Sequence, residues 1–379
     1  MQGTSVGWVS PMQALGLFFA SVPDPRAGNA RHDLSELLFI AFAAVLCGAE
    51  SCADMAEFGC AKAAALRQVL RLRHGIPSHD TFSRVFRLLD PVPFAAAFRK
   101  FTAAFAAHRS GQVGTAGRCV AVDGKSLAGA FESGARATPL HLVTAWAADQ
   151  RLVLAQQHAP GRREVSAALA LVALLDLHAT TVTADALHST RKMARAIRQQ
   201  GGDYVLALKG NRGPLYHRAK ALLGGVAAGA SEGTEKPLHG RRERRQAAVV
   251  AVPGDWPARF HFAGLAAVAR IDSRRQSGQT EQQQSRYFVL SRLLAPAEVL
   301  PIVRAHWSIE NQQHWLLDVV LAEDHARTRK DHGAENLALL RRLALNLLQA
   351  DTHNASIRRK IKRAGWEDAY LFTLLSQMR

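Results

Sequence analysis

The sequence is poor in cysteine, in aromatic residues and in hydrophobic runs long enough to span a bilayer. Its four cysteines, Cys47, Cys52, Cys60 and Cys119, form no CxxC pair and show no spacing of a zinc site or a disulfide framework. We therefore expect these cysteines to be reduced packing residues in a cytoplasmic protein. The apolar stretch "LLFIAFAAVLCGA" at 37–49 is too short to cross a membrane and predicts a buried helix. No basic segment precedes the first apolar stretch, which argues against a signal peptide.

Acidic residues are also few relative to basic ones. The chain has 48 Lys and Arg against 31 Asp and Glu, a formal net charge of +17, which predicts a polyanionic partner. Residues 212–292 hold 14 basic and 6 acidic residues, whereas residues 293–350 hold 6 basic and 7 acidic ones. An acidic cluster in this second segment could hold a cation beside a bound phosphate.

The patterning predicts several segments in a chain of 379 residues. Apolar positions recur at helical spacing from Leu34 to Val45, and "PSHDTFSRVF" offers Ser78 or Asp80 as an N-cap. Residues 1–109 are therefore predicted to form an all-α N-terminal domain for DNA binding or dimerisation. "RSGQVGTAG" at 109–117 has the composition of a linker.

After the linker, residues 118–211 change to alternating and short apolar runs. "RCVAVDG" predicts a strand ending at Asp123, and "HLVTAWAADQRLVLAQ" predicts two strands turning at Asp149-Gln150. The helical "EVSAALALVALLDL", a strand ending at Asp185, a helix and the strand "DYVLALKGN" follow. Three strands, helix, strand, helix, strand is the order of a ribonuclease H-like core.

The predicted fold is thus α/β, a mixed sheet with flanking helices. A basic, β-rich insertion at 212–292 interrupts the core, with strands in "HGRRERRQAAVVAV", "FHFAGLAAVARI" and "SRYFVLS". Residues 293–350 should complete the core with helices, and residues 351–379 form a basic helical tail.

Three acids are the candidate catalytic residues. Asp123 and Asp185 each follow a predicted strand, and neighbouring strand ends can bring two carboxylates to one metal, although Asp at such a place also forms turns. Glu310 lies in "HWSIENQQHWLLDV", where a helix would project His306, Glu310 and His314 from one face. Two Asp and one Glu suit Mg²⁺ or Mn²⁺, and two such ions could support in-line displacement at a phosphodiester.

Other interpretations of this segment remain open. His306, Glu310 and His314 could form a helical zinc site, although no further ligand is evident. Asp318, Glu323 and Asp324 compete with Glu310 for the role of third acid.

Eight segments together resemble one known family. The chain is similar to DDE-type insertion-sequence transposases of the ISAs-like, or H-repeat-associated, group. The segments, in the family's order, are "VPDPR", "ELLFIAFAAVLCGAES", "PSHDTFSRVFRLLDP", "VAVDGKSL", "TADALHSTRKMA", "GGDYVLALKGN", "HGRRERR" and "HWSIENQQHWLLDVVLAEDHARTR" with its continuation "ENLALLRRLALNLL". The resemblance implies Asp123, Asp185 and Glu310 as the ligands of Mg²⁺ or Mn²⁺.

The sequence departs from the wider superfamily near two of its acids. The Tyr, Arg and Lys of the Tyr–Arg–Glu–Lys signature are replaced by Val303, His306 and Leu317, so hairpin handling of DNA ends does not transfer. In "GRREVS" at 161–166, Glu164 matches the family's Lys-Ser-Asn-Glu and its neighbours do not.

Candidate DNA contacts follow the strand ends and the insertion. They are Lys125, Lys209, Asn211, Arg241, Arg242, Arg244, Arg245 and His306, with solvated turns or a charged strand edge as the alternative for several of them. The resemblance implies a transposase that binds the terminal inverted repeats of its element, cuts the DNA and joins the 3'-hydroxyl ends to target DNA. We expect a homodimer in the active complex. The rivals are a catalytically inactive or domesticated DNA-binding protein and a stand-alone metal-dependent nuclease.

Overall fold

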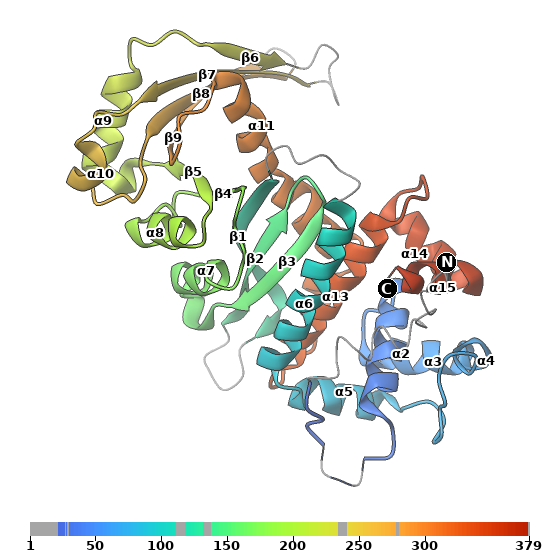
Figure 1. Ribbon diagram of the computed structural model, residues 1–379. Coiled ribbons are helices and arrows are strands. Elements are labelled where there is room, and N and C mark those ends of the chain that lie inside the picture. Colours follow the sequence, from blue (N-terminus) through green and yellow to red (C-terminus); the bar gives the residue numbers. More distant parts are fainter. Residues whose placement is uncertain are drawn as a thin grey trace, which may run out of the picture.

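The computed structural model describes residues 22–26, 28, 30–110, 118–131, 138–233, 241–277 and 280–377 (Figure 1). Most of the predicted linker at 109–117 falls outside these residues. None of the helices in the described part of the chain is long and apolar enough to cross a membrane.

A single mixed sheet organises the chain. The described strands pair in the order β3-β2-β1-β4-β5-β9-β8-β7-β6. β1 is antiparallel to β2 and parallel to β4, and β4 is parallel to β5. The first five strands therefore confirm the predicted ribonuclease H-like core. The strand bounds are β1 (Arg118–Phe131), β2 (Pro139–Ala147), β3 (Leu152–His158), β4 (Thr180–Ala184), β5 (Asp203–Leu208), β6 (Ala230–Gly233), β7 (Arg241–Ala251), β8 (Ala267–Ser277) and β9 (Thr280–Leu290).

Helices cover both faces of this sheet because its strands are apolar on both sides. Val120 and Val122 pack with α7 (Glu164–Val172) and α8 (Arg191–Gln199) on one face, whereas Ala121 joins the core on the other. That second face carries α6 (Pro91–Ser110), α11 (Pro296–His306) and α13 (Gly333–Ala350). Asp123 and Ala121 are two residues apart in β1, so their side chains share this second face.

The predicted β-rich insertion extends the core sheet. β9 pairs antiparallel with β5, with Leu206 opposite Val289, and β8, β7 and β6 follow outward. β8 begins at Ala267, later than the sequence predicts, because the residues that follow the short helix α10 (Trp256–Arg259) form turns, in which the N–H of Leu265 donates to the carbonyl of Phe262. α9 (Gly213–Leu223) packs against β7 and β8, and Figure 1 shows α11 running from this extension back to the core.

The N-terminal helices share one apolar core with the C-terminal helices. Phe39 and Phe42 belong to the same buried cluster as Leu343 and Leu374. Figure 1 shows the blue N-terminal helices beside the red C-terminal ones, and the first described helix contacts the last two. The helices involved are α2 (Leu34–Leu46), α3 (Cys52–Ala61), α4 (Ala63–Leu66), α5 (His79–Leu88), α6, α13, α14 (Ile357–Trp366) and α15 (Asp368–Ser376). Of the two predicted N-caps, Ser78 caps α5 by accepting the N–H of Thr81.

Candidate active site

Asp123 lies inside a strand, not at its end as the sequence predicts. β1 continues to Phe131 because its antiparallel pairing with β2 continues, with Asp123 opposite Thr144. The parallel pairing of β1 with β4 ends earlier, at Val122 and Ala184. Asp123 therefore sits where β1 leaves β4.

Asp185 follows β4 directly, as predicted. Its Oδ1 accepts the backbone N–H groups of Leu187 at 2.9 Å and His188 at 3.2 Å, which closes a turn after the strand. On both β1 and β4, an aspartate thus directly follows the last residue of their parallel pairing.

Glu310 lies in a π-helical turn, η3 (Ile309–His314), between α11 and α12 (Trp315–Val319). The N–H of Trp315 donates to the carbonyl of Glu310, five residues earlier, so a regular α-helix does not continue through this segment. Side chains anchor the turn to β2, since Trp146 Nε1 donates to Ser308 Oγ at 2.9 Å and Gln313 donates to Thr144 at 3.3 Å.

One cavity of about 500 Å³ collects the three predicted acids. Asp123, Asp185 and Glu310 line it, and so do the predicted DNA-contact residues Lys209 and His306. Two ions about 4 Å apart, each about 2 Å from its oxygens, accommodate ligand atoms up to about 8 Å apart. The three carboxylates reach one cavity, but their ligand atoms do not all lie within 4.8 Å of one another.

The electrostatics of Asp123 also suit a cation. The pKa of Asp123 is raised to about 7, first by burial and also by the negative charges of Asp185 and Glu164, against the backbone hydrogen bond of Gly124 and the charge of His188. A divalent cation bound at this carboxylate would relieve the repulsion and keep it ionised.

Mn²⁺ affinity is accordingly expected to depend on pH. A cation competes with the proton on Asp123, so affinity should rise as pH increases through about 7 and level off above it. Titration calorimetry at pH 6 and pH 8 should give a difference of about tenfold. Glu310→Gln, which keeps Asp123, should show weaker binding with the same pH dependence; a pH-independent affinity in the wild type would contradict this interpretation.

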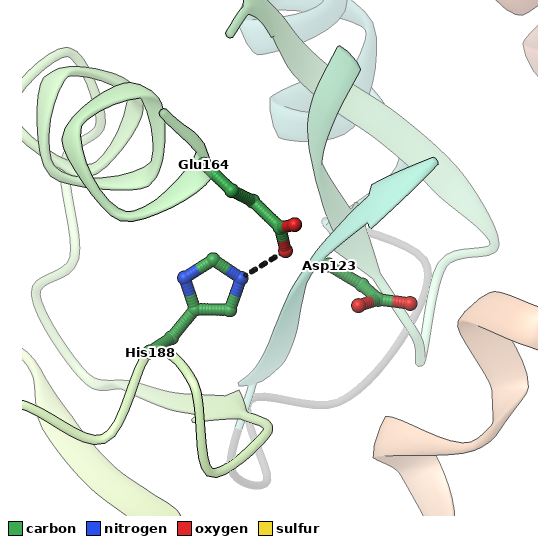
Figure 2. Close-up of side chains that lie close together, drawn as sticks. All are labelled: Asp123, Glu164 and His188. Carbon is green, nitrogen blue, oxygen red and sulfur yellow. Dashed lines mark hydrogen bonds and ion pairs between the residues drawn. The ribbon is translucent and has the colours of Figure 1, made fainter. Parts of the chain in front are cut away.

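Glu164 is a further residue of the site that the sequence does not place there. Asp123, Glu164 and His188 each offer one possible ligand atom, and these three atoms lie within 4.8 Å of one another (Figure 2). Among the described His, Cys, Asp and Glu residues, this is the one group of three that meets this distance. His306, Glu310 and His314, the alternative zinc ligands considered from the sequence, are therefore not brought together at that distance. The match of Glu164 in "GRREVS" was the one sequence signal for this residue.

Two histidines hold the Glu164 carboxylate. His141 Nε2 lies 2.8 Å from Oε2, and His188 Nε2 lies 2.8 Å from Oε1. These two hydrogen bonds lower the pKa of Glu164 to about 2, although burial opposes the shift. An ionised carboxylate only accepts hydrogen bonds, so both histidines donate from Nε2.

The two histidines flanking Glu310 are neutral near pH 7. Burial lowers the pKa of His306 to about 4, which outweighs the opposite effect of the Asp185 charge. Burial likewise lowers the pKa of His314 to about 4, and its Nδ1 lies 3.9 Å from Asp123. His306 would therefore meet DNA as an uncharged hydrogen-bonding group, and its Nδ1 lies 3.3 Å from the Thr183 hydroxyl.

Lys125 is placed differently from its predicted role in DNA contact. Its side chain is 7% exposed, and Nζ lies 2.6 Å from Asp318, 3.0 Å from Asp324 and 3.5 Å from Glu323. A phosphate contact would require these ion pairs to break, so the structure gives Lys125 a structural position instead. Asp318, Glu323 and Asp324 are the acids that compete with Glu310 for the role of third acid, and Lys125 pairs with all three. None of these three acids lines the cavity that holds Asp123 and Asp185.

The remaining predicted DNA contacts divide between two faces. Arg245 lines a second groove, of about 350 Å³, that reaches Glu310, whereas the neighbouring Arg244 points to the opposite face of β7. Arg242 shares the face of Arg244, and the side chain of Arg241 lies outside the described part of the chain. Asn211 donates to the carbonyl of Ala186 at 2.9 Å and so joins the turn after β5 to the turn after β4.

Similarity to known proteins identifies the family. Residues 114–347 match the family model described as "Transposase DDE domain", and residues 17–102 match the one described as "DDE_Tnp_1-associated". The chain belongs to the DDE transposase family. This confirms the resemblance found in the sequence.

Full-length relatives and one solved structure extend the comparison. The transposase is 30% identical over 376 residues to "Putative transposase YncI" of Escherichia coli O157:H7, covering 96% of this chain and 95% of that protein. It is 30% identical over 367 residues to "H repeat-associated putative transposase YhhI" of Escherichia coli K12, covering 94% and 96%. The piggyBac transposase synaptic complex with hairpin DNA aligns at a TM-score of 0.45 and 11% identity, covering 96% and 81%.

Proposed function

We propose that this transposase binds the ends of an insertion sequence, cuts phosphodiester bonds by metal-assisted hydrolysis and transfers the 3'-hydroxyl ends to target DNA. One observation carries the proposal: Asp123, Asp185 and Glu310, from three distant parts of the sequence, line one cavity. They would hold Mg²⁺ or Mn²⁺. When bound, two such ions activate the attacking hydroxyl and stabilise the leaving oxygen.

The chain's own cations would hold the DNA backbone at this cavity. Lys209 and Arg286 line it together with the three acids. The guanidinium of Arg286 lies 4.4 Å from the ring centre of Trp307, a cation–π contact that restricts its position. A charged donor restricted in this way can bind a phosphate next to the bond that is cut.

The second groove would guide the DNA toward Glu310. Its floor is the outer part of β7–β9, where cross-strand neighbours present polar and basic side chains on one face. The groove is lined by Glu243, Arg245, Ser273, Arg275, Gln282, Gln284, Arg286, Trp307, Glu310 and Asn311. A basic, hydrogen-bonding surface of this kind suits sequence-independent contacts to phosphates and sugars.

Two neighbouring arginines test the groove. Arg275 lines it, whereas Arg274 is exposed on the opposite face of β8. Arg275→Ala is expected to weaken binding of terminal-repeat DNA. The logarithm of the affinity falls linearly with the logarithm of the salt concentration, and Arg275→Ala should make this slope shallower by about 0.9 for each phosphate that the arginine no longer neutralises. Arg274→Ala should keep the wild-type slope, as measured by fluorescence anisotropy; equal effects of the two changes would remove the groove from the DNA path.

The function itself is tested by cleavage and joining. The full-length protein should nick duplex DNA carrying the element's terminal repeats when Mg²⁺ or Mn²⁺ is added, and it should join the cut ends to a second duplex. Binding without cutting would identify an inactive DNA-binding protein, and cutting without joining a stand-alone nuclease. Because two DNA ends must be handled together, we expect a dimer on the DNA, which light scattering of the complex measures.

A further inference from the structure

We propose that Glu164 is a positioning residue that sets the separation of the two candidate metal-binding aspartates, by joining His141 and His188. This inference rests on the proposed function of the cavity. Glu164 opens α7, and its carboxylate lies between the turn after β4 and the hairpin of β1 and β2, with Asp123 beside it (Figure 2).

The connection to Asp185 passes through His188. The backbone N–H of His188 donates to Asp185 Oδ1 at 3.2 Å, and its ring donates to Glu164 Oε1 at 2.8 Å. His188 is fully buried, so its ring cannot turn freely to solvent. A single residue thus holds the Asp185 carboxylate through its backbone and Glu164 through its side chain.

The connection to Asp123 passes through β1 and β2. His141 donates to Glu164 Oε2 at 2.8 Å, and its other ring nitrogen hydrogen-bonds with the Ser126 hydroxyl at 2.8 Å. Gly124, directly after Asp123, leaves room for the carboxylate, since a Cβ there would lie 2.5 Å from the carboxyl carbon of Glu164. The backbone beside Asp123 is therefore in contact with Glu164.

Glu164 acts where the sheet no longer holds the two aspartates together. The parallel pairing of β1 and β4 stops at Val122 and Ala184, one residue before each aspartate. Beyond that point, the bridge from His141 through Glu164 to His188 spans the gap between the two chain segments. Because both carboxylate oxygens accept a hydrogen bond, the carboxylate is held in one orientation. Removing groups that orient metal ligands in this way changes metal affinity by about 10–100-fold.

Glu164→Gln tests this role with little change in size. The amide nitrogen cannot accept an N–H, so one of the two histidines can keep its hydrogen bond only by moving its ring proton from Nε2 to Nδ1. We expect the dissociation constant for Mn²⁺, measured by EPR on the free protein, to rise about tenfold or more. The Mn²⁺ concentration needed for half-maximal cleavage should rise in parallel, while excess Mn²⁺ restores most of the maximal rate. Binding of terminal-repeat DNA in Ca²⁺ should stay within about twofold of the wild type.

Glu335→Gln is the matched control. Glu335 also lies in the first turn of a helix, its side chain is also 18% exposed, and His158 lies 3.5 Å from it, but it does not line the cavity. Its replacement should leave Mn²⁺ affinity unchanged. Gly124→Ala, which displaces the Glu164 carboxylate from the other side, should weaken Mn²⁺ binding as Glu164→Gln does; it provides the test if Glu164→Gln fails to fold.

The outcomes separate this inference from the proposed function. Suppose that the wild type cuts DNA and that Glu164→Gln changes neither the Mn²⁺ affinity nor the Mn²⁺ concentration needed for cleavage. This result would overturn the positioning role and leave the proposed function standing. A lower unfolding temperature with unchanged Mn²⁺ affinity would overturn it as well, because the role would then be structural only. If instead the wild type binds Mn²⁺ tightly but does not cut DNA, and the variant binds Mn²⁺ more weakly, the positioning role is supported and the proposed function is refuted.

Discussion

Replacing Asp123 with Asn is expected to reduce DNA cleavage about a thousandfold or more while DNA binding is kept. Asp123 lines the cavity with both other candidate ligands, and an amide neither carries the negative charge nor matches the cation affinity of a carboxylate. Metal ions contribute several kcal/mol to such reactions, and each 1.36 kcal/mol changes the rate about tenfold. Rates of nicking with saturating Mn²⁺, and DNA affinity in Ca²⁺, measure the two effects.

Asp176→Asn provides the control for this change. Asp176 is exposed and hydrogen-bonds with its neighbour His178, away from the cavity. Its replacement should leave cleavage within about twofold of the wild type. If Asp123→Asn cut DNA as fast as Asp176→Asn, the cavity would not be the catalytic site.

Replacing Arg342 with Met is expected to lower the free energy of unfolding by about 3–5 kcal/mol. Arg342 and Glu323 are both fully buried, with Arg342 Nη1 2.6 Å from Glu323 Oε1. Burial opposes the ionisation of Glu323, but the charges of Arg342 and Lys125 outweigh it and lower its pKa. Loss of Arg342 leaves a buried carboxylate with weaker compensation. Urea denaturation followed by circular dichroism measures the change.

Two further variants define the cause of that destabilisation. Arg304 is exposed and lies 3.9 Å from Glu232, so Arg304→Met should cost less than about 1 kcal/mol. Adding Glu323→Leu to Arg342→Met removes the uncompensated charge and should recover part of the stability. A double variant no more stable than Arg342→Met would show that the buried charge is not what destabilises the single variant.

The core could be predicted from the sequence because its signals are local. Alternating runs ending near Asp123 and at Asp185 indicated the strands, and helical spacing indicated the helices between them. The extent of β1 was wrong by eight residues, since pairing with β2 continues past Asp123 and pairing with β4 does not. The π-helical turn at Glu310 was also missed, because "WSIENQQHW" has ordinary helical composition and its anchors, Trp146 and Thr144, lie far away in sequence.

The residues around the cavity show why its surroundings could not be predicted. Lys125 follows Asp123 by two residues, a position suited to binding phosphate, but its partners Asp318, Glu323 and Asp324 lie almost two hundred residues later. Glu164 stands at the start of a helix, where acids are common for local reasons, and its histidine partners are reached only through the fold. Contacts of this range depend on tertiary packing, which no short motif records.

The central claim is that the carboxylates of Asp123, Asp185 and Glu310 hold divalent cations together. Crystals of the protein grown or soaked with Mn²⁺, with diffraction recorded near the manganese absorption edge, test it directly. The account predicts anomalous density inside the cavity, in contact with all three side chains. Density confined to Asp123, Glu164 and His188, or an absence of density at saturating Mn²⁺, would contradict it.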